Sequence, residues 1–167
     1  MAPLSPALEF QIEKQTRLLG SFAVECVIVG GVAATLHGSE IPTSDIDVCY
    51  ARTPQNLARL ATALKSVNAH LRNAPTDILF LLDAETLRRG LKFTFTTDIG
   101  SIDLLGEVRG VGFYPDVYAD SVLFELFGYT FPVIDLKKLI AAKRAAGRPK
   151  DLMAVSELEA IAEADVE

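Results

Sequence analysis

The sequence is poor in cysteine and histidine, with two of each among its 167 residues. Cys26 and Cys49 both lie in apolar runs, and no C-x-x-C pair with metal-ligand spacing occurs. This pattern argues against a disulfide framework and against a cysteine-ligated metal. We therefore expect the two cysteines to be small core residues of a protein in a reduced compartment.

Long apolar runs and a basic leader are also missing. The first 20 residues contain no basic head followed by an apolar stretch, so no signal peptide is expected. The longest apolar runs are far shorter than the roughly 20 residues that a membrane-spanning helix needs. These absences predict a soluble, cytoplasmic protein with no membrane partner.

An excess of positive charge is absent as well, because 16 basic residues are outnumbered by 22 acidic ones and the net charge is −6. A chain of this balance does not coat nucleic acid, so any polyanion must meet a local basic patch. Half of the residues are hydrophobic, which is enough for a buried core. The length predicts one domain, with an N-terminal helix in 1–20, an α/β core in 21–134 and C-terminal helices in 135–167.

Hydrophobic periodicity and turn residues predict an α/β (α+β) fold with a small mixed β-sheet, flanking helices and a C-terminal helical hairpin. The apolar segment 78–82 fits either a strand or a helix. Helices are expected over about 6–19, 32–36, 54–67, 136–146 and 151–162, with Asp151 capping the last. Strands are expected over about 23–29, 45–50, 91–96 and 102–105, and in a hairpin over 122–133.

Gly30 and Gly31 separate a β-branched run from a short helix. Glycine there permits a positive φ and lets a ligand approach the backbone, and the helix N-terminus offers free N–H groups to an anion. A purely structural turn is the more common role of such a pair. The two glycines alone therefore indicate an anion site only weakly.

Three aspartates form the second candidate feature. Asp45 and Asp47 are two residues apart in a predicted strand, so both carboxylates lie on one face and repel each other unless a cation lies between them. Asp103 lies between apolar residues of a later strand. If that strand neighbours the first, Asp103 reaches the same site and completes an oxygen ligand set suited to Mg²⁺. Otherwise it is a solvent-facing acid at a hairpin edge.

A basic segment near the C-terminus stands out in this acidic chain. Lys137, Lys138 and Arg144 fit a solvated helix face. Lys143 follows apolar residues at helical spacing, so it can lean toward the sheet. Together with Arg148 and Lys150 it is a candidate to neutralise a phosphate-bearing ligand.

The glycine and aspartate features together resemble the signature of the polymerase-β-like nucleotidyltransferase superfamily. The run 27–31 ends in Gly-Gly, thirteen residues follow, and then comes Asp45-Ile46-Asp47-Val48, with a third carboxylate on a later strand. The segment 135–152 resembles the tail of small bacterial members related to abortive-infection and toxin–antitoxin nucleotidyltransferases. The resemblance spans about residues 24–158.

This resemblance implies a nucleotidyltransferase fold in which Asp45, Asp47 and Asp103 hold Mg²⁺ or Mn²⁺ and act in catalysis. Gly30 and Gly31 would cradle the triphosphate of an NTP such as ATP, with Lys143, Arg148 and Lys150 as further contacts. The reaction would move a nucleoside monophosphate to a hydroxyl of an unidentified acceptor (tRNA or another RNA, a protein or a small molecule). An antitoxin partner and a homodimer formed through the apolar segment 122–127 are further expectations.

Two departures from the family pattern keep other functions open. Many members carry Ser where this chain has Gly31, and related small proteins carry Arg at the place of Ile41. These differences favour a non-catalytic nucleotide-binding or protein-interaction module on the same fold, whereas the three aspartates favour an enzyme. A phosphatase-like metal hydrolase is a weaker alternative, because the Thr that follows the Asp pair in that class is missing.

Overall fold

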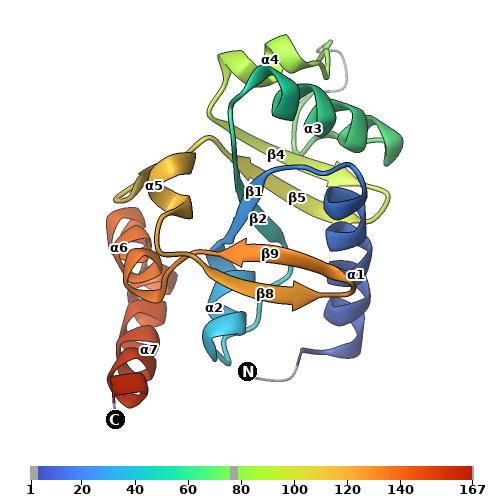
Figure 1. Cartoon of the computed structure of the whole chain (residues 1–167). Helices are drawn as coiled ribbons and strands as arrows, with labels where there is room; N and C mark the ends of the chain where they lie inside the picture. The colour runs from blue at the N-terminus through green and yellow to red at the C-terminus, as the bar shows by residue number, and fades with distance from the viewer. Residues whose placement is uncertain (1–3, 76–78, 167) are drawn as a thin grey trace.

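The computed structural model describes residues 4–75 and 79–166 and has the mixed α/β architecture predicted from the sequence (Figure 1). Seven strands of this part of the chain form one sheet in the order β3-β4-β5-β2-β1-β9-β8. These strands are β1 (Cys26–Val29), β2 (Ile46–Tyr50), β3 (His70–Leu71), β4 (Lys92–Thr97), β5 (Gly100–Leu105), β8 (Val122–Leu126) and β9 (Tyr129–Val133). A separate small ribbon pairs β6 (Glu107–Val108) with β7 (Gly112–Phe113).

The centre of the sheet mixes parallel and antiparallel pairs. Strand β2 is antiparallel to β1 and parallel to β5, and β1 is parallel to β9. The β4–β5 and β8–β9 pairs are antiparallel hairpins, as the alternating sequence predicts. The parallel β2–β5 pair brings two segments about 55 residues apart in sequence into direct register.

Seven helices of the described chain surround the sheet. They are α1 (Pro6–Ser21), α2 (Gly30–His37), α3 (Pro54–Ser66), α4 (Ala84–Arg89), α5 (Tyr114–Tyr118), α6 (Leu136–Ala146) and α7 (Pro149–Val166). Figure 1 shows α1 on one side of the sheet and α5, α6 and α7 on the other. No helix in the described ranges has the length and apolar character that crossing a bilayer requires.

Side-chain alternation along β2 separates the core from the site. Ile46 and Val48 are fully buried, and they lie on the opposite face of the strand from Asp47. The same alternation on β5 buries Ile102 and Leu104 and leaves Asp103 on the side of Asp47. The core therefore fixes both strands while two carboxylates remain on the other face.

The predicted helices and strands are present with bounds that agree to within a few residues, but the sequence does not predict the short elements α4, α5, β3, β6 and β7. The starts of three predicted elements also differ. Helix α2 begins at Gly30 itself, and β2 begins at Ile46, so Asp45 immediately precedes the strand. Helix α7 begins at Pro149, so Asp151 lies inside its first turn, where its carboxylate accepts a hydrogen bond from the Arg148 backbone N–H at 3.2 Å. Of the ambiguous segment 78–82, residues 79–82 are irregular and residue 78 lies outside the described ranges.

Candidate active site

Asp47 and Asp103 lie opposite each other on neighbouring strands. The parallel register of β2 and β5 pairs Asp47 with Asp103, and that of β1 and β2 pairs Val29 with Asp47. The prediction that the strand of Asp103 neighbours that of the Asp pair is therefore confirmed. The register places the end of β1, and hence Gly30, directly beside Asp47.

Asp47 is the most strongly perturbed acid of this group. Its burial and the neighbouring Asp103 carboxylate raise the pKa of Asp47 to about 7, and Asp45 contributes in the same direction. The positive charge of Lys143 opposes this rise. A buried carboxyl beside two other acids favours its neutral form unless a cation compensates the charge.

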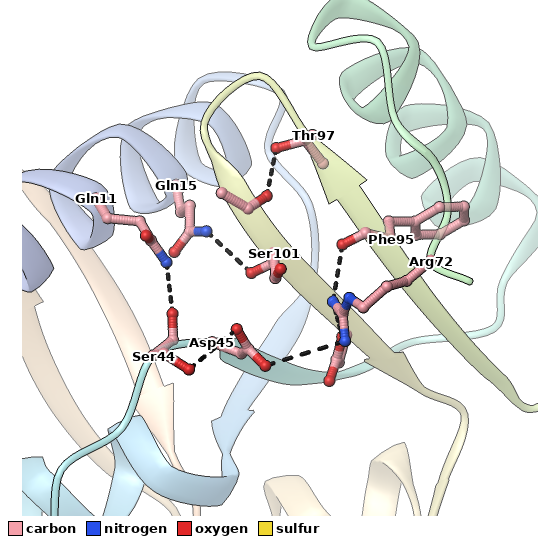
Figure 2. Close-up of polar contacts among 10 residues, drawn as sticks. Gln11, Gln15, Ser44, Asp45, Arg72, Phe95, Thr97 and Ser101 are labelled. Carbon is pink, nitrogen blue, oxygen red and sulfur yellow. Dashed lines mark hydrogen bonds and ion pairs between the residues drawn. The ribbon is translucent and has the colours of Figure 1, made fainter.

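Two glutamines of α1 fix the backbone that carries the aspartates (Figure 2). Gln11 donates through Nε2 to the carbonyl of Ser44 at 2.7 Å, immediately before Asp45. Gln15, which is fully buried, donates to the carbonyl of Ser101 at 3.0 Å, two residues before Asp103. Helix α1 thus ties together the starts of the two strands that position the carboxylates.

Both the backbone conformation of Gly30 and the space around it favour glycine over any other residue. Its φ is +66°, which side chains other than glycine's rarely adopt. A Cβ at this position would overlap the Asp47 carboxylate, whose Cγ would lie 2.9 Å away. The glycine therefore allows the first turn of α2 to approach the carboxylate closely.

Gly31 leaves room for a hydroxyl group that comes from another part of the chain. A Cβ on Gly31 would overlap Oγ1 of Thr43, with Cβ of Thr43 only 2.8 Å away. Thr43 lies in the loop before Asp45 and lines the same cavity as Gly31 and the three aspartates. The hydroxyl that the sequence lacks at position 31 is therefore present beside it, on Thr43.

A polar cavity of about 380 Å³ extends from the carboxylates over the start of α2. It brings together seven of the eight site residues predicted from the sequence. The eighth, Gly30, lies in the wall of an adjoining cavity. The seven are Gly31, Asp45, Asp47, Asp103, Lys143, Arg148 and Lys150.

The second cavity, of about 580 Å³, shares Asp47, Lys143 and Arg148 with the first. Its walls are less polar, because α6 contributes Leu139 and Ala142 and the strands contribute further apolar side chains. Glu107 and Arg109 also line it. The carboxylates thus lie where a polar and a mostly apolar cavity meet.

Two of the three predicted basic residues, Lys143 and Arg148, are paired with an acid that the sequence predicts only as a helix cap. Asp151 is buried and accepts a hydrogen bond from Arg148 Nε at 2.6 Å, and its Oδ1 lies 3.8 Å from Lys143 Nζ. Burial opposes ionisation of Asp151, but Arg148 and Lys143 together hold the pKa of this carboxyl below its usual value. Lys143 leans toward the sheet, as predicted, and its side chain is only 19% exposed.

The donor set suits a hard divalent cation, since three carboxylates line one cavity and Asp47 is destabilised in its charged form. Within residues 4–75 and 79–166, however, no three acidic, histidine or cysteine side chains surround a common point closely enough to hold a metal as they stand. Arg72 contacts two of the three aspartates, with Nη2 2.8 Å from Asp103 Oδ1 and Nη1 4.0 Å from Asp45 Oδ2. The residues fit the ion chemically, and one oxygen of Asp103 is engaged by the guanidinium.

Sequence reasoning missed Arg72, Thr43 and the two α1 glutamines. Arg72 and Thr43 lie in segments without periodicity, and their contacts depend on distant partners. Gln15 carried a usable signal, because it occupies a position between Ile12 and Leu19 where the helix face is apolar. A polar residue in such a stripe indicates a buried hydrogen bond.

No family model and no curated protein matches the sequence. Several solved structures resemble the fold. A lincosamide antibiotic adenylyltransferase, LnuA, solved with lincomycin bound, superposes with a TM-score of 0.59 at 12% identity, over 90% of this chain and 96% of that one. A protein of Thermotoga maritima provisionally assigned as a nucleotidyltransferase gives 0.52 at 17% identity, over 86% and 91% of the two chains.

An antigenic nucleotidyltransferase-like protein of Paracoccidioides brasiliensis also gives a TM-score of 0.52, at 16% identity, over 96% of this chain and 78% of that one. All three similarities extend over most of both chains at low identity, so what they establish is the fold. The central sheet and the helices packed on it are those of the nucleotidyltransferase fold.

Proposed function

We propose that this protein is a divalent-metal-dependent nucleotidyltransferase, which transfers a nucleoside monophosphate from an NTP to a hydroxyl group. The observation that carries the proposal is the direct pairing of Asp47 with Asp103 beside Gly30, at the wall of a cavity lined by basic side chains. The nucleotidyltransferase folds of the similar structures support the general kind of reaction.

In this proposal the triphosphate lies in the polar cavity. Backbone N–H groups at the start of α2 face an anion there, together with the Thr43 hydroxyl. Lys143, Arg148 and Lys150 supply positive charge for the phosphates and for the pyrophosphate that leaves. The nucleoside moiety lies in the second cavity, against the apolar side of α6.

Asp45, Asp47 and Asp103 are the residues that would hold Mg²⁺ or Mn²⁺. Bound divalent ions would neutralise charge that develops on the phosphoryl oxygens and on the leaving group. The acceptor hydroxyl oxygen forms a bond to the α-phosphorus, and the bond between the α-phosphorus and the bridging oxygen of pyrophosphate breaks. The hydroxyl proton passes to Asp103, which lies at the edge of the polar cavity.

A small molecule is the acceptor class that we favour. The adenylyltransferase that resembles this chain over most of its length has the antibiotic lincomycin bound, and the described chain folds around two compact cavities. RNA and protein acceptors, and a role in a toxin–antitoxin pair, are alternatives for the same chemistry.

A thermal-shift screen of the four NTPs with and without Mn²⁺ tests the proposal, because a ligand of the folded state raises its melting temperature by mass action. We expect a metal-dependent shift with at least one NTP, and its loss in the Asp45→Ala/Asp47→Ala variant. That NTP, labelled at the α-phosphate, then serves as the donor in transfer assays with candidate acceptors.

A non-catalytic nucleotide-binding module is the second candidate. The specific observation in its favour is Arg72, which engages Asp103 where a nucleotidyltransferase needs a free carboxylate. An NTP-dependent shift that needs no metal and survives the double aspartate change would favour this module over the enzyme.

A further inference from the structure

Arg72 occupies a fixed position beside the candidate metal ligands. It follows the short strand β3, and its backbone N–H donates to the carbonyl of Thr94 at 2.9 Å. Its Nη2 donates to Asp103 Oδ1 at 2.8 Å and to the carbonyl of Phe95 at 2.9 Å (Figure 2). These hydrogen bonds hold both its backbone and its guanidinium in place, and its side chain is 26% exposed.

The guanidinium supplies most of the local compensation for two of the three acids. Among the described residues, Asp45 and Asp103 each have one ion-pair partner, and in both cases it is Arg72. The positive charge of Lys143 acts on Asp47, and Lys143 is itself paired with Asp151. Arginine remains charged at all accessible pH values. The site therefore carries a permanent cation of its own.

A divalent ion among these carboxylates would lie close to that cation. The two positive charges repel each other in a partly buried site, where screening by solvent is weak. Because Phe95 and the β3–β4 pairing anchor Arg72, the side chain does not simply move away. Additional negative charge is then needed to offset the repulsion between Arg72 and the divalent ion. The phosphates of an NTP supply such charge.

We propose that Arg72 is a built-in counter-cation that prevents the aspartates from holding a divalent ion tightly on their own, so that the metal binds together with the nucleotide. This inference rests on the proposed function for the identity of the ligands. Arg72 is a positioning residue in this scheme, since it acts through Asp45 and Asp103. The site would remain essentially metal-free until an NTP arrives.

Titration with Mn²⁺ alone, followed by the EPR signal of the free ion, tests the inference. Arg72→Gln keeps a hydrogen-bond donor but removes the charge, and we expect it to tighten Mn²⁺ binding at least tenfold. Arg72→Lys keeps the charge and serves as the matched control, with an affinity close to that of the unaltered chain. Addition of Asp47→Asn to Arg72→Gln should abolish the gain.

An Arg72→Gln variant that is folded by circular dichroism and binds Mn²⁺ no more tightly than the unaltered chain overturns the inference. If that variant does not fold, the unaltered chain decides the question. Its affinity for Mn²⁺ should rise at least tenfold when a non-hydrolysable NTP analogue is present. Tight binding of Mn²⁺ alone, in the micromolar range, would refute the proposal.

The same titrations separate this inference from the proposed function. A gain in Arg72→Gln without any NTP-dependent response refutes the nucleotidyltransferase and the coupling to the nucleotide, but leaves Arg72 as the counter-cation that weakens metal binding. An NTP-dependent response that requires Asp47, without tighter Mn²⁺ binding in Arg72→Gln, supports the nucleotidyltransferase and refutes the role of Arg72. Absence of both responses refutes both.

Discussion

Asp47 and Asp103 are paired residue for residue across the parallel strands β2 and β5, although 55 positions separate them in the sequence. The pairing brings two carboxyl groups into side-chain contact on the face of the sheet that α6 approaches. Like charges in such contact are unfavourable in a partly buried setting. The protein therefore stores electrostatic repulsion at the place where a cation is proposed to bind.

The first prediction concerns the pH dependence of stability. Burial and Asp103 raise the pKa of Asp47 from 3.8 to about 7. The folded chain thus retains a proton on Asp47 where the unfolded chain has lost it. The resulting stabilisation is complete below about pH 3.8 and is lost as the pH rises through about 7.

Asp47→Asn removes this titration, so without metal the variant should gain stability relative to the unaltered chain as the pH rises. We expect a gain of about 1–3 kcal/mol at pH 8 relative to pH 5, measured by urea unfolding. Lys143 and Arg148 also face this carboxyl and limit the size of the gain, whereas Asp45 and Asp103 increase it. The exposed Asp116 is a suitable control, and Asp116→Asn should follow the unaltered chain at both pH values.

The second prediction concerns Gly30. Gly30→Ala introduces a Cβ at a positive φ and against the Asp47 carboxylate, so it should cost about 2–4 kcal/mol of unfolding free energy. Gly128 is the control that isolates the backbone strain from the steric overlap with Asp47. Its φ is +91°, and a Cβ there would meet no atom within 4 Å. Gly128→Ala should cost only about 1–2 kcal/mol. Equal losses in the two variants would mean that the contact with Asp47 has no energetic weight.

The sequence predicts the part of the site that depends on local pattern. The change from a β-branched run to Gly30-Gly31 marks the end of β1, and the alternation around Asp47 assigns it to the face opposite the core. That the strand of Asp103 lies beside the strand of Asp47 is only a hypothesis from the sequence. Period-2 alternation says which face of a sheet a residue occupies but not which strand lies next to it.

The remaining residues depend on tertiary contacts that no local pattern encodes. Arg72 reaches Asp103 only because a two-residue strand pairs with β4, and so short a strand leaves no periodicity. Thr43 meets Gly31 through the path of an irregular loop. The sequence predicts Asp151 as a helix cap, and packing of α7 on α6 in addition buries it against Lys143 and Arg148.

The third prediction tests whether Thr43 occupies the place of a side chain at position 31. Gly31→Ser should destabilise the fold by about 1–3 kcal/mol, because its Cβ overlaps the Thr43 side chain. Thr43→Gly in the same chain removes the obstacle and should recover most of this loss. A double-mutant cycle measured by urea unfolding should give a coupling of at least about 1 kcal/mol. Additive effects would show that the two positions do not compete for space.

The fourth prediction concerns the second cavity. Ala142 lines it from α6, so Ala142→Trp should fill part of its volume of about 580 Å³ and block the nucleoside moiety. We expect the NTP-dependent rise in melting temperature to be lost. Binding of Mn²⁺ to the Arg72→Gln chain should not change when Ala142→Trp is added, because the carboxylates are untouched.

Lys137 provides the matched control for this substitution, because it lies on the same helix with its side chain exposed and lines neither cavity. Lys137→Trp should leave the NTP-dependent shift intact. If Ala142→Trp folds and still shows the full shift, the nucleoside does not lie in the second cavity. The base would then have to lie elsewhere, and the loop of Ile41 and Thr43, which lines the polar cavity, is the next place to test.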